Sequence, residues 1–284
     1  MILAPLRGVT IRCFREVFAD VLRETGFTEA FTPFITANPG LDPLKDRELK
    51  GVRDGLRLTP QFIGKDPAAL RFCLERIKSA GFETADLNCG CPYPMVRNKG
   101  RGSGILRTPD LLRRMMEVGC EVMGPGRFSV KTRLGVERPD ELLALMPLIN
   151  EFPLRFLTVH ARTAKQMYEG TCDHEMLHEV EKAAKVPLVL NGDLPLPAAR
   201  SFEHSEHSSH LMIGRAFIRH LGERDDIGDL LDRYVEDSVA ELCGERPVIG
   251  RLKELLAYWK DMPRWNRRWQ VAKLARNLGE LRVW

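Results

Sequence analysis

The sequence contains no apolar run long enough to cross a bilayer, and Met1 leads into Ile2-Leu3-Ala4-Pro5 without a basic signal region. It contains no internal repeat, no low-complexity segment and few aromatic residues (7%). Its seven cysteines are an odd number and lack the paired spacing of a zinc knuckle. These absences predict a cytoplasmic protein with reduced thiols and no membrane association.

Charge is distributed unevenly along the chain, although the net charge is only +4. Residues 245–284 carry ten Lys and Arg against four Asp and Glu, whereas the other residues carry 33 against 35. All four tryptophans lie in the same basic segment. This composition predicts an anionic macromolecular partner bound by the C-terminal segment. The alternative is a helical domain with a solvated cationic face and a tryptophan core.

Short β-rich runs alternate with amphipathic helical patterns from residue 1 to about 220. This alternation predicts an α/β fold of the (β/α)₈ TIM-barrel type. A doubly wound sheet is the alternative, but no Gly-x-Gly-x-x-Gly pattern follows the first strand. The predicted strands are 1–5, 27–34, 58–64, 83–89, 127–134, 156–161, 187–192 and 210–214.

The strand pattern ends near residue 223, and helical patterns follow at 225–242, 248–259 and 264–278. We therefore predict two domains, a barrel over residues 1–222 and a small all-helical domain over residues 223–284.

The segment Asp86–Gly104 combines a strand end with a glycine-rich cationic loop. Its sequence, DLNCGCPYPMVRNKGRGSG, places the amide of Asn88 and the thiol of Cys91 around Gly90, which permits a turn. The nearby cations Arg97, Lys99 and Arg101 predict an anionic, planar substrate. The alternative is a tight structural turn in which both cysteines are small buried hydrophobes.

Polar residues recur at the carboxyl ends of the predicted strands, which face the active site in a barrel. Asn191-Gly192-Asp193 and Gly214-Arg215 follow the last two strands, where barrels commonly bind phosphate. We therefore predict a phosphorylated cofactor across this rim. The residues at the strand ends are Pro5, Thr32, Gln61, Asn88, Cys91, Lys131, Arg133, His160, Arg162, Asn191, Gly214 and Arg215.

A second short motif, His174-Glu175-Met176-Leu177-His178, matches the His-Glu-x-x-His pattern of zinc hydrolases. No third ligand stands at the expected spacing, and Asp173 is a good helix cap. We therefore interpret the segment as an ordinary barrel helix and predict no metal site.

Together these motifs resemble the tRNA-dihydrouridine synthase family in order and spacing. The Asn-Cys-Gly-Cys-Pro form is most similar to the bacterial branch called dihydrouridine synthase C. The resembling segments cover most of residues 1–217: Leu3-Ala4-Pro5…Gly8-Val9, Gln61–Gly64, Asp86–Pro92, Lys131–Gly135, Val159–Thr163, Asn191–Asp193 and Ile213–Arg215.

The resemblance implies an FMN-bearing (β/α)₈ barrel followed by a helical tRNA-binding domain. It implies that NADPH reduces FMN, and that hydride passes to C6 of a flipped-out uracil of the tRNA D-loop. Cys91 would then protonate C5 as a general acid, while Asn88, Lys131 and Arg133 hold the uracil. The implied FMN-binding residues are Ala4, Pro5, Gln61, Lys131, His160, Asn191, Gly192, Asp193, Gly214 and Arg215.

The chain departs from the family pattern at three places. Leu6-Arg7 replaces a Met followed by a small or acidic residue, Pro33 stands in place of an acidic residue, and Tyr93-Pro94 replaces small polar or basic residues. The C-terminal segment is also short. Two alternatives remain open: a flavin barrel acting on a small pyrimidine, as in dihydroorotate dehydrogenases, or a tRNA-binding relative without turnover. We expect a monomer.

Overall fold

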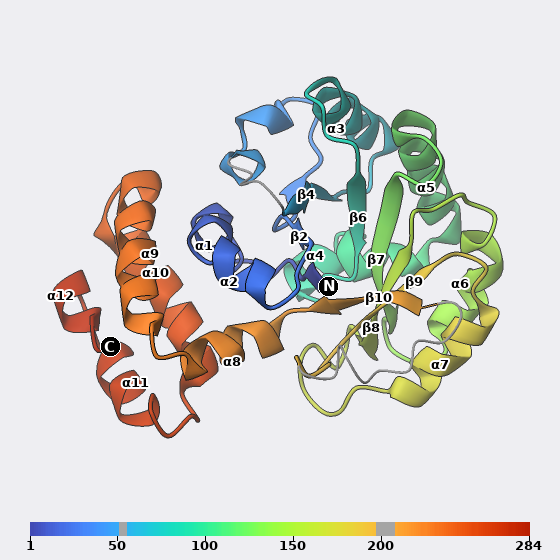
Figure 1. Cartoon of the computed structure of the whole chain (residues 1–284). Helices are drawn as coiled ribbons and strands as arrows, with labels where there is room; N and C mark the ends of the chain where they lie inside the picture. Colours follow the sequence, from blue (N-terminus) through green and yellow to red (C-terminus); the bar gives the residue numbers. More distant parts are fainter. Residues whose placement is uncertain (51–55, 197–207) are drawn as a thin grey trace.

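The computed structural model describes residues 1–50, 56–196 and 208–284, and Figure 1 shows their arrangement. Within these residues, none of the helices has the length and apolar character needed to span a membrane. All seven cysteines are free.

The strands of the described residues form one parallel sheet in the order β3-β5-β6-β7-β8-β9-β10-β1-β2-β4. Pro60 separates β4 from β5, because proline has no N–H for a ladder. Since β2 pairs with β4 and β3 pairs with β5, the sheet closes on itself. The predicted (β/α)₈ fold is confirmed. The bounds are β1 Ile2–Leu3, β2 Glu29–Phe31, β3 Ile35–Thr36, β4 Arg57–Thr59, β5 Gln61–Ile63, β6 Ala85–Cys89, β7 Phe128–Gly135, β8 Leu157–Thr163, β9 Leu188–Asn191 and β10 Ser208–Ile213.

Helices surround this sheet, and two of them, α3 and α7, begin at a carboxylate cap. The carboxylate of Asp66 accepts from Ala68 N at the start of α3, with Pro67 at the first helical position. Asp173 caps α7, the helix that contains the His-Glu-x-x-His pattern. The first helical segment is divided at Phe18 into α1 and α2. The bounds are α1 Arg12–Val17, α2 Ala19–Glu24, α3 Pro67–Ser79, α4 Pro94–Arg97, α5 Pro109–Met123, α6 Glu141–Ile149, α7 His174–Ala183 and α8 Arg215–Glu223, with 3₁₀ turns at η1 Pro43–Lys45, η2 Arg47–Leu49 and η3 Gly102–Arg107.

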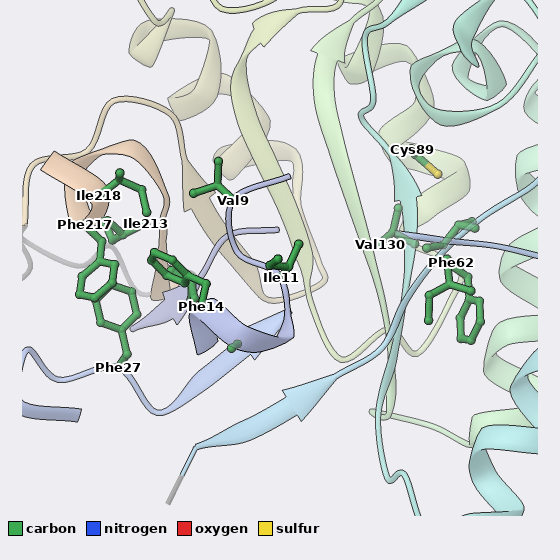
Figure 2. Close-up of a cluster of buried hydrophobic side chains, with 14 of the residues drawn as sticks. Val9, Ile11, Phe14, Phe27, Phe62, Cys89, Val130, Ile213, Phe217 and Ile218 are labelled. Carbon is green, nitrogen blue, oxygen red and sulfur yellow. The ribbon is translucent and has the colours of Figure 1, made fainter. Parts of the chain in front are cut away.

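Alternate side chains of a strand point to the apolar core between sheet and helices and to the interior of the barrel. Cys89 belongs to the outer apolar core, where Figure 2 shows it beside Phe62 and Val130. Asp86 and Asn88, on the same strand, are instead hydrogen bonded across the barrel interior. A small apolar cluster fills another part of the barrel: Ile2, Ala4, Phe31, Phe156, Val189 and Met212.

The C-terminal helices pack around a pair of buried tryptophans. Trp259 and Trp265 are 0% and 1% exposed, with ring centroids 4.5 Å apart. Their Nε1 atoms donate to Ile218 O and Gly222 O of α8. The expectation that the tryptophans meet an external partner is therefore wrong for these two, which form a core. The bounds are α9 Ile227–Leu242, α10 Glu245–Leu256, η5 Ala257–Trp259, α11 Asn266–Ala272 and α12 Leu278–Leu281.

The helical domain also packs against the first barrel helix, as Figure 1 shows for α1 and α9. The thiol of Cys13 on α1 donates to Glu241 Oε2 on α9 at 2.8 Å. Gly8 lies against Arg251 and Glu254 of α10, so closely that a Cβ would be 2.2 Å from Glu254 Oε2. The loop after β1 is therefore fixed between the barrel and the helical domain.

Candidate active site

A cavity of about 1030 Å³ lies at the carboxyl ends of the strands and extends to the helical domain. Tyr258 and Lys260 form part of its wall, so both parts of the chain contribute. Of the residues that the family resemblance implied for catalysis, uracil binding or FMN binding, every one except Gln61 lines this cavity. These residues are Ala4, Pro5, Asn88, Cys91, Lys131, Arg133, His160, Asn191, Gly192, Asp193, Gly214 and Arg215.

The turn that carries Cys91 is held by the side chain of Asn88. The amide oxygen of Asn88 accepts from Gly90 N at 3.1 Å and from Cys91 N at 2.9 Å. From the other side, Ser103 donates to Cys91 O through its N–H and its hydroxyl. Gly102 has φ +56°, and a Cβ there would lie 2.8 Å from Cys91 Cβ. The turn is thus fixed in place before any substrate binds.

The two cysteines of the motif have different environments. Cys89 is fully buried in the apolar core, as the structural alternative predicted. Cys91 is 7% exposed and faces the cavity. Burial raises the pKa of the Cys91 thiol, although Arg133 and Arg7 act in the opposite direction. At neutral pH the thiol therefore keeps its proton, as a proton donor requires.

Gln61 lies outside the cavity wall, although it was predicted to bind the cofactor. It is fully buried, and its Nε2 donates to Asp86 Oδ2 at 2.8 Å. Its Oε1 accepts from Asn88 Nδ2 at 2.7 Å. Gln61 therefore orients the side-chain amide of Asn88 by a hydrogen bond from the interior of the barrel.

Lys131 extends from β7 to the opposite wall, where its Nζ donates to Asn191 Oδ1 at 2.9 Å. Asn191 is itself oriented by its bond from Nδ2 to Met212 O. Burial lowers the pKa of Lys131 to about 7, and the neighbouring Arg133 adds to the effect. A nearby anion would restore the charged form.

Arg133 is 2% exposed and is held by main-chain carbonyls. Its guanidinium donates to Gly90 O, Thr163 O and Met167 O at 2.7 to 2.9 Å. Its Cζ also lies 5.2 Å from the centroid of the Tyr168 ring. Arg133 therefore joins the Cys91 turn to the loop after β8.

The glycine-rich end of the cavity is built around Asp193. This carboxylate forms ion pairs with Arg162 and Arg215. Burial favours a higher pKa for Asp193, but the hydrogen bond from Arg162 and the charge of Arg215 outweigh it and lower the pKa. Gly192 has φ +117°, and a Cβ there would lie 2.7 Å from the ring of His160. Asp193 thus orients Arg215 at the first turn of α8.

His160 lies between these groups on β8 and is 7% exposed. Burial lowers its pKa well below the usual value, and Arg133, Lys131, Arg162 and Arg215 lower it further. A neutral imidazole contributes hydrogen-bonding capacity to the cavity without adding charge.

Two of the three departures from the family pattern place a side chain in the cavity wall. Arg7 lines the cavity, and its Cζ lies 5.2 Å from the centroid of the Phe34 ring. Tyr93 also lines the cavity and is 44% exposed. Pro33 precedes Phe34 in the chain but is buried outside the cavity wall.

Sequence reasoning missed or misplaced several residues. Tyr168 contacts Arg133 and Arg215 but belongs to no motif, and it follows Met167, which has φ 50°. Arg162 stood at a strand end, but its pairing with Asp193 had no local signal. The predicted cations Arg97, Lys99 and Arg101 are absent from the cavity wall, so their expected role near the substrate stays a prediction.

The charges of the cavity wall fit a phosphorylated, electron-rich cofactor. Among the described residues, seven Lys and Arg side chains line the cavity against four Asp and Glu. Lys131 has a neutral amide as its hydrogen-bond partner, and its pKa is lowered first by burial and further by the neighbouring Arg133. A flavin phosphate near Arg215 and a flavin ring near Lys131 would offset that surplus. The residues present therefore fit a flavin nucleotide.

Comparison with solved structures defines the class of fold. Morphinone reductase in complex with tetrahydroNAD aligns with a TM-score of 0.52 and 12% identity, over 77% of this chain and 83% of that one. The old yellow enzyme homologue from Zymomonas mobilis aligns with a TM-score of 0.56 and 14% identity, over 77% and 85%. At these identities the similarity establishes the barrel fold alone.

Sequence comparison then defines the family. The model for dihydrouridine synthase (Dus) matches residues 2–220. The tRNA-dihydrouridine synthase B of Serratia marcescens is 26% identical over 91% of this chain and 78% of its own length. That of Vibrio cholerae is 30% identical over 76% and 66%, and a probable tRNA-dihydrouridine synthase of Helicobacter pylori is 29% identical over 92% and 83%. The chain belongs to the dihydrouridine synthase family of enzymes.

Proposed function

We propose that this protein is an FMN-dependent tRNA-dihydrouridine synthase that uses NADPH to reduce a uridine of the tRNA D-loop. The observation that carries the proposal is a neutral thiol held rigidly in a cation-rich cavity within a barrel of this family. When bound, the flavin accepts hydride from NADPH and supplies it to C6 of the uracil.

The residues that would hold FMN lie at the glycine-rich end of the cavity. Arg215 and the N–H groups of the first turn of α8 suit the phosphate, and Asp193 fixes the guanidinium in place. Lys131 and Asn191 suit the ring, joined by their mutual hydrogen bond. The other proposed FMN-binding residues form the cavity wall around these groups: Ala4, Pro5, His160, Gly192 and Gly214.

Cys91 is the proposed proton donor to C5 of the uracil. Its raised pKa keeps the sulfur protonated, and the bonds at Asn88 and Ser103 limit its movement. Fixed geometry of this kind favours proton transfer, because the donor must be within hydrogen-bond distance of the acceptor. Arg133 supports the same turn through Gly90 O.

Asn88 also gives a reason for selecting uracil. Its amide oxygen is occupied by two backbone N–H groups, so the amide can offer only an N–H to the cavity. That N–H matches the carbonyl oxygen at position 4 of uracil. Cytosine carries an amino group at this position, so the N–H of Asn88 would face another N–H donor.

The helical domain, residues 223–284, is the proposed tRNA-binding domain. The basic excess of residues 245–284 supports this assignment, because phosphates of folded RNA attract Lys and Arg. Tyr258 and Lys260 bring this domain to the cavity itself, where a flipped base would enter. We propose a monomer that acts on tRNA in the cytoplasm.

The Asn-Cys-Gly-Cys-Pro motif supports placement near the dihydrouridine synthase C branch. The reported relatives with a branch name are B enzymes at 26% and 30% identity. We therefore keep the C branch as a proposal, to be tested by the position of the modified nucleotide.

The test is mass analysis of nucleosides after the purified protein is incubated with unmodified bacterial tRNA and NADPH. We expect uridine to gain two hydrogens, and sequencing of the product to locate the position. Omission of NADPH is the control. If NADPH is oxidised without a mass change in tRNA, whereas a free pyrimidine is reduced, the small-pyrimidine enzyme is the correct alternative.

A further inference from the structure

Beneath the cavity, side chains from three neighbouring strands form one continuous series of hydrogen bonds. Ser129 Oγ donates to Asp86 Oδ1 at 2.7 Å, and Gln61 Nε2 donates to Asp86 Oδ2 at 2.8 Å. Asn88 Nδ2 donates to Gln61 Oε1 at 2.7 Å. We call Asp86, Gln61 and Asn88 the amide relay. Ser129, Asp86 and Gln61 are 0% exposed and Asn88 is 8% exposed.

The direction of this relay is fixed at its upper end by the main chain. The N–H groups of Gly90 and Cys91 can only donate, so the oxygen of Asn88 must face them. Its nitrogen then faces Gln61 and requires an acceptor there. Gln61 in turn presents its nitrogen to position 86. The series is satisfied only if the residue at position 86 accepts.

Asp86 provides that acceptor. We propose that Asp86 is a positioning residue that fixes the direction of the Asn88 amide through Gln61, and thereby holds the Gly90–Cys91 turn. The consequence for turnover rests on the proposed function, whereas the consequence for the turn itself does not. Asp86 is not part of the cavity wall, and its hydrogen bonds reach the Cys91 turn only through the relay. Its charge also acts on Lys131, but Asp86→Asn and Asp86→Leu remove that effect alike.

The acceptor role does not depend on the charge of Asp86. Burial raises the pKa of Asp86 to about 7, so both protonation states are accessible at neutral pH. In the protonated form, Oδ1 can carry the proton toward Ser129 while Oδ2 still accepts from Gln61. Ser129 can then donate toward Ala85 O, 3.4 Å away.

This independence from charge distinguishes two substitutions at the same position. In Asp86→Asn, the amide oxygen can accept from Gln61 while the amide nitrogen donates to Ser129. In Asp86→Leu, the volume is similar but the acceptor is gone, and Gln61 Nε2 is left without a partner. Gln61→Met breaks the relay at its middle and serves if the Leu variant does not fold.

Thr158→Val is the matched control. Thr158 is 0% exposed on β8, and among the described residues its Oγ1 has no hydrogen-bond partner. The substitution removes a buried polar atom of a neighbouring strand without touching the relay.

The first measurement is the rate at which iodoacetamide alkylates Cys91 in the purified full-length flavoprotein, followed by peptide mass spectrometry. We expect the rate to rise about tenfold in Asp86→Leu and Gln61→Met, because the turn loses its fixed support. Asp86→Asn and Thr158→Val should stay within about twofold of wild type. Equal rates in the Asn and Leu variants, or no change in the Leu and Met variants, would overturn the proposal.

The second measurement is kcat and KM for tRNA, with flavin content determined for each variant by absorbance. We expect kcat to fall about 100-fold in Asp86→Leu with KM unchanged, as for a misplaced reacting group. Asp86→Asn should recover most of this loss. A role in packing alone would not distinguish Asn from Leu in kcat. If wild type fails to reduce tRNA while the alkylation pattern holds, the proposed function is wrong and the relay stands.

Discussion

The two ends of the cavity hold their functional groups by different chemistry. At the thiol end, Cys91 is positioned by amides and main-chain groups, and Asn88 occupies both of the turn's N–H donors. At the glycine-rich end, Arg215 is positioned by the charged Asp193, which also holds Arg162. Carboxylate–guanidinium pairs are thus found where a phosphate would bind. Near the sulfur, burial keeps the pKa of the thiol raised, although the hydrogen bond at the Tyr93 backbone and the charges of Arg133 and Arg7 act in the opposite direction.

The largest expected effect is at the thiol end. Cys91→Ala should reduce kcat by about 10² to 10⁴, because the proton donor is removed while the turn remains in place. Flavin content and the affinity for tRNA should stay near wild type. The measurement is a steady-state rate together with flavin absorbance.

Cys89→Ala is the control within the same motif. Cys89 is buried in the apolar core, so its loss should lower stability while turnover remains. A Cys91→Ala enzyme as fast as wild type would show that the general acid lies elsewhere.

A smaller effect is expected at the charged end. Arg215→Met should weaken flavin binding about 10- to 100-fold, the range for one hydrogen bond to a charged group. The dissociation constant can be measured by fluorescence titration of the flavin-free protein with FMN. Arg224→Met is the control, because Arg224 follows the same helix and is not itself in the cavity wall, although it pairs with Glu24, which is, as well as with Asp226. Equal losses in the two variants would indicate a general effect on α8.

A third effect is expected in stability rather than in activity or binding, and it depends on pH. Because burial raises the pKa of Asp86 from 3.8 to about 7, the folded state holds a proton that the unfolded chain releases. The contribution of Asp86 is therefore fully favourable below about pH 4 and is lost as the pH rises to about 7. Asn does not titrate, so Asp86→Asn should gain stability over wild type across this window, by at most about 4 kcal/mol.

Urea unfolding of wild type and Asp86→Asn at pH 4.5, 6 and 7.5 checks whether the stability difference grows with pH. The other titrating groups are the same in the two proteins, so their contributions cancel in the difference. A stability difference that stays constant over these pH values, or falls with rising pH, would contradict the raised pKa.

The comparison also shows what the sequence could predict. Strand ends and some helix starts follow from local signals, so the cap of α7 at Asp173 was predicted, and the rim residues were predicted to lie together. The partners of Gln61 and the position of Tyr168 depend on strand register and on a left-handed residue in a loop. Such contacts join distant parts of the chain and leave no local pattern. The tryptophans were ambiguous for a similar reason, because composition does not tell a core from a binding surface.

Helix α8 lies between the two parts of the molecule and belongs to both. Its first residue, Arg215, lines the cavity, and its carbonyls at Ile218 and Gly222 accept from the tryptophans of the helical domain. Over nine residues it spans only about 14 Å. It is therefore short and is bonded at both ends. A rotation of the C-terminal helices would move α8 with them, because the two tryptophans are hydrogen bonded to it. A substrate that binds these helices would thereby shift Arg215 at the end of the cavity that suits a phosphate.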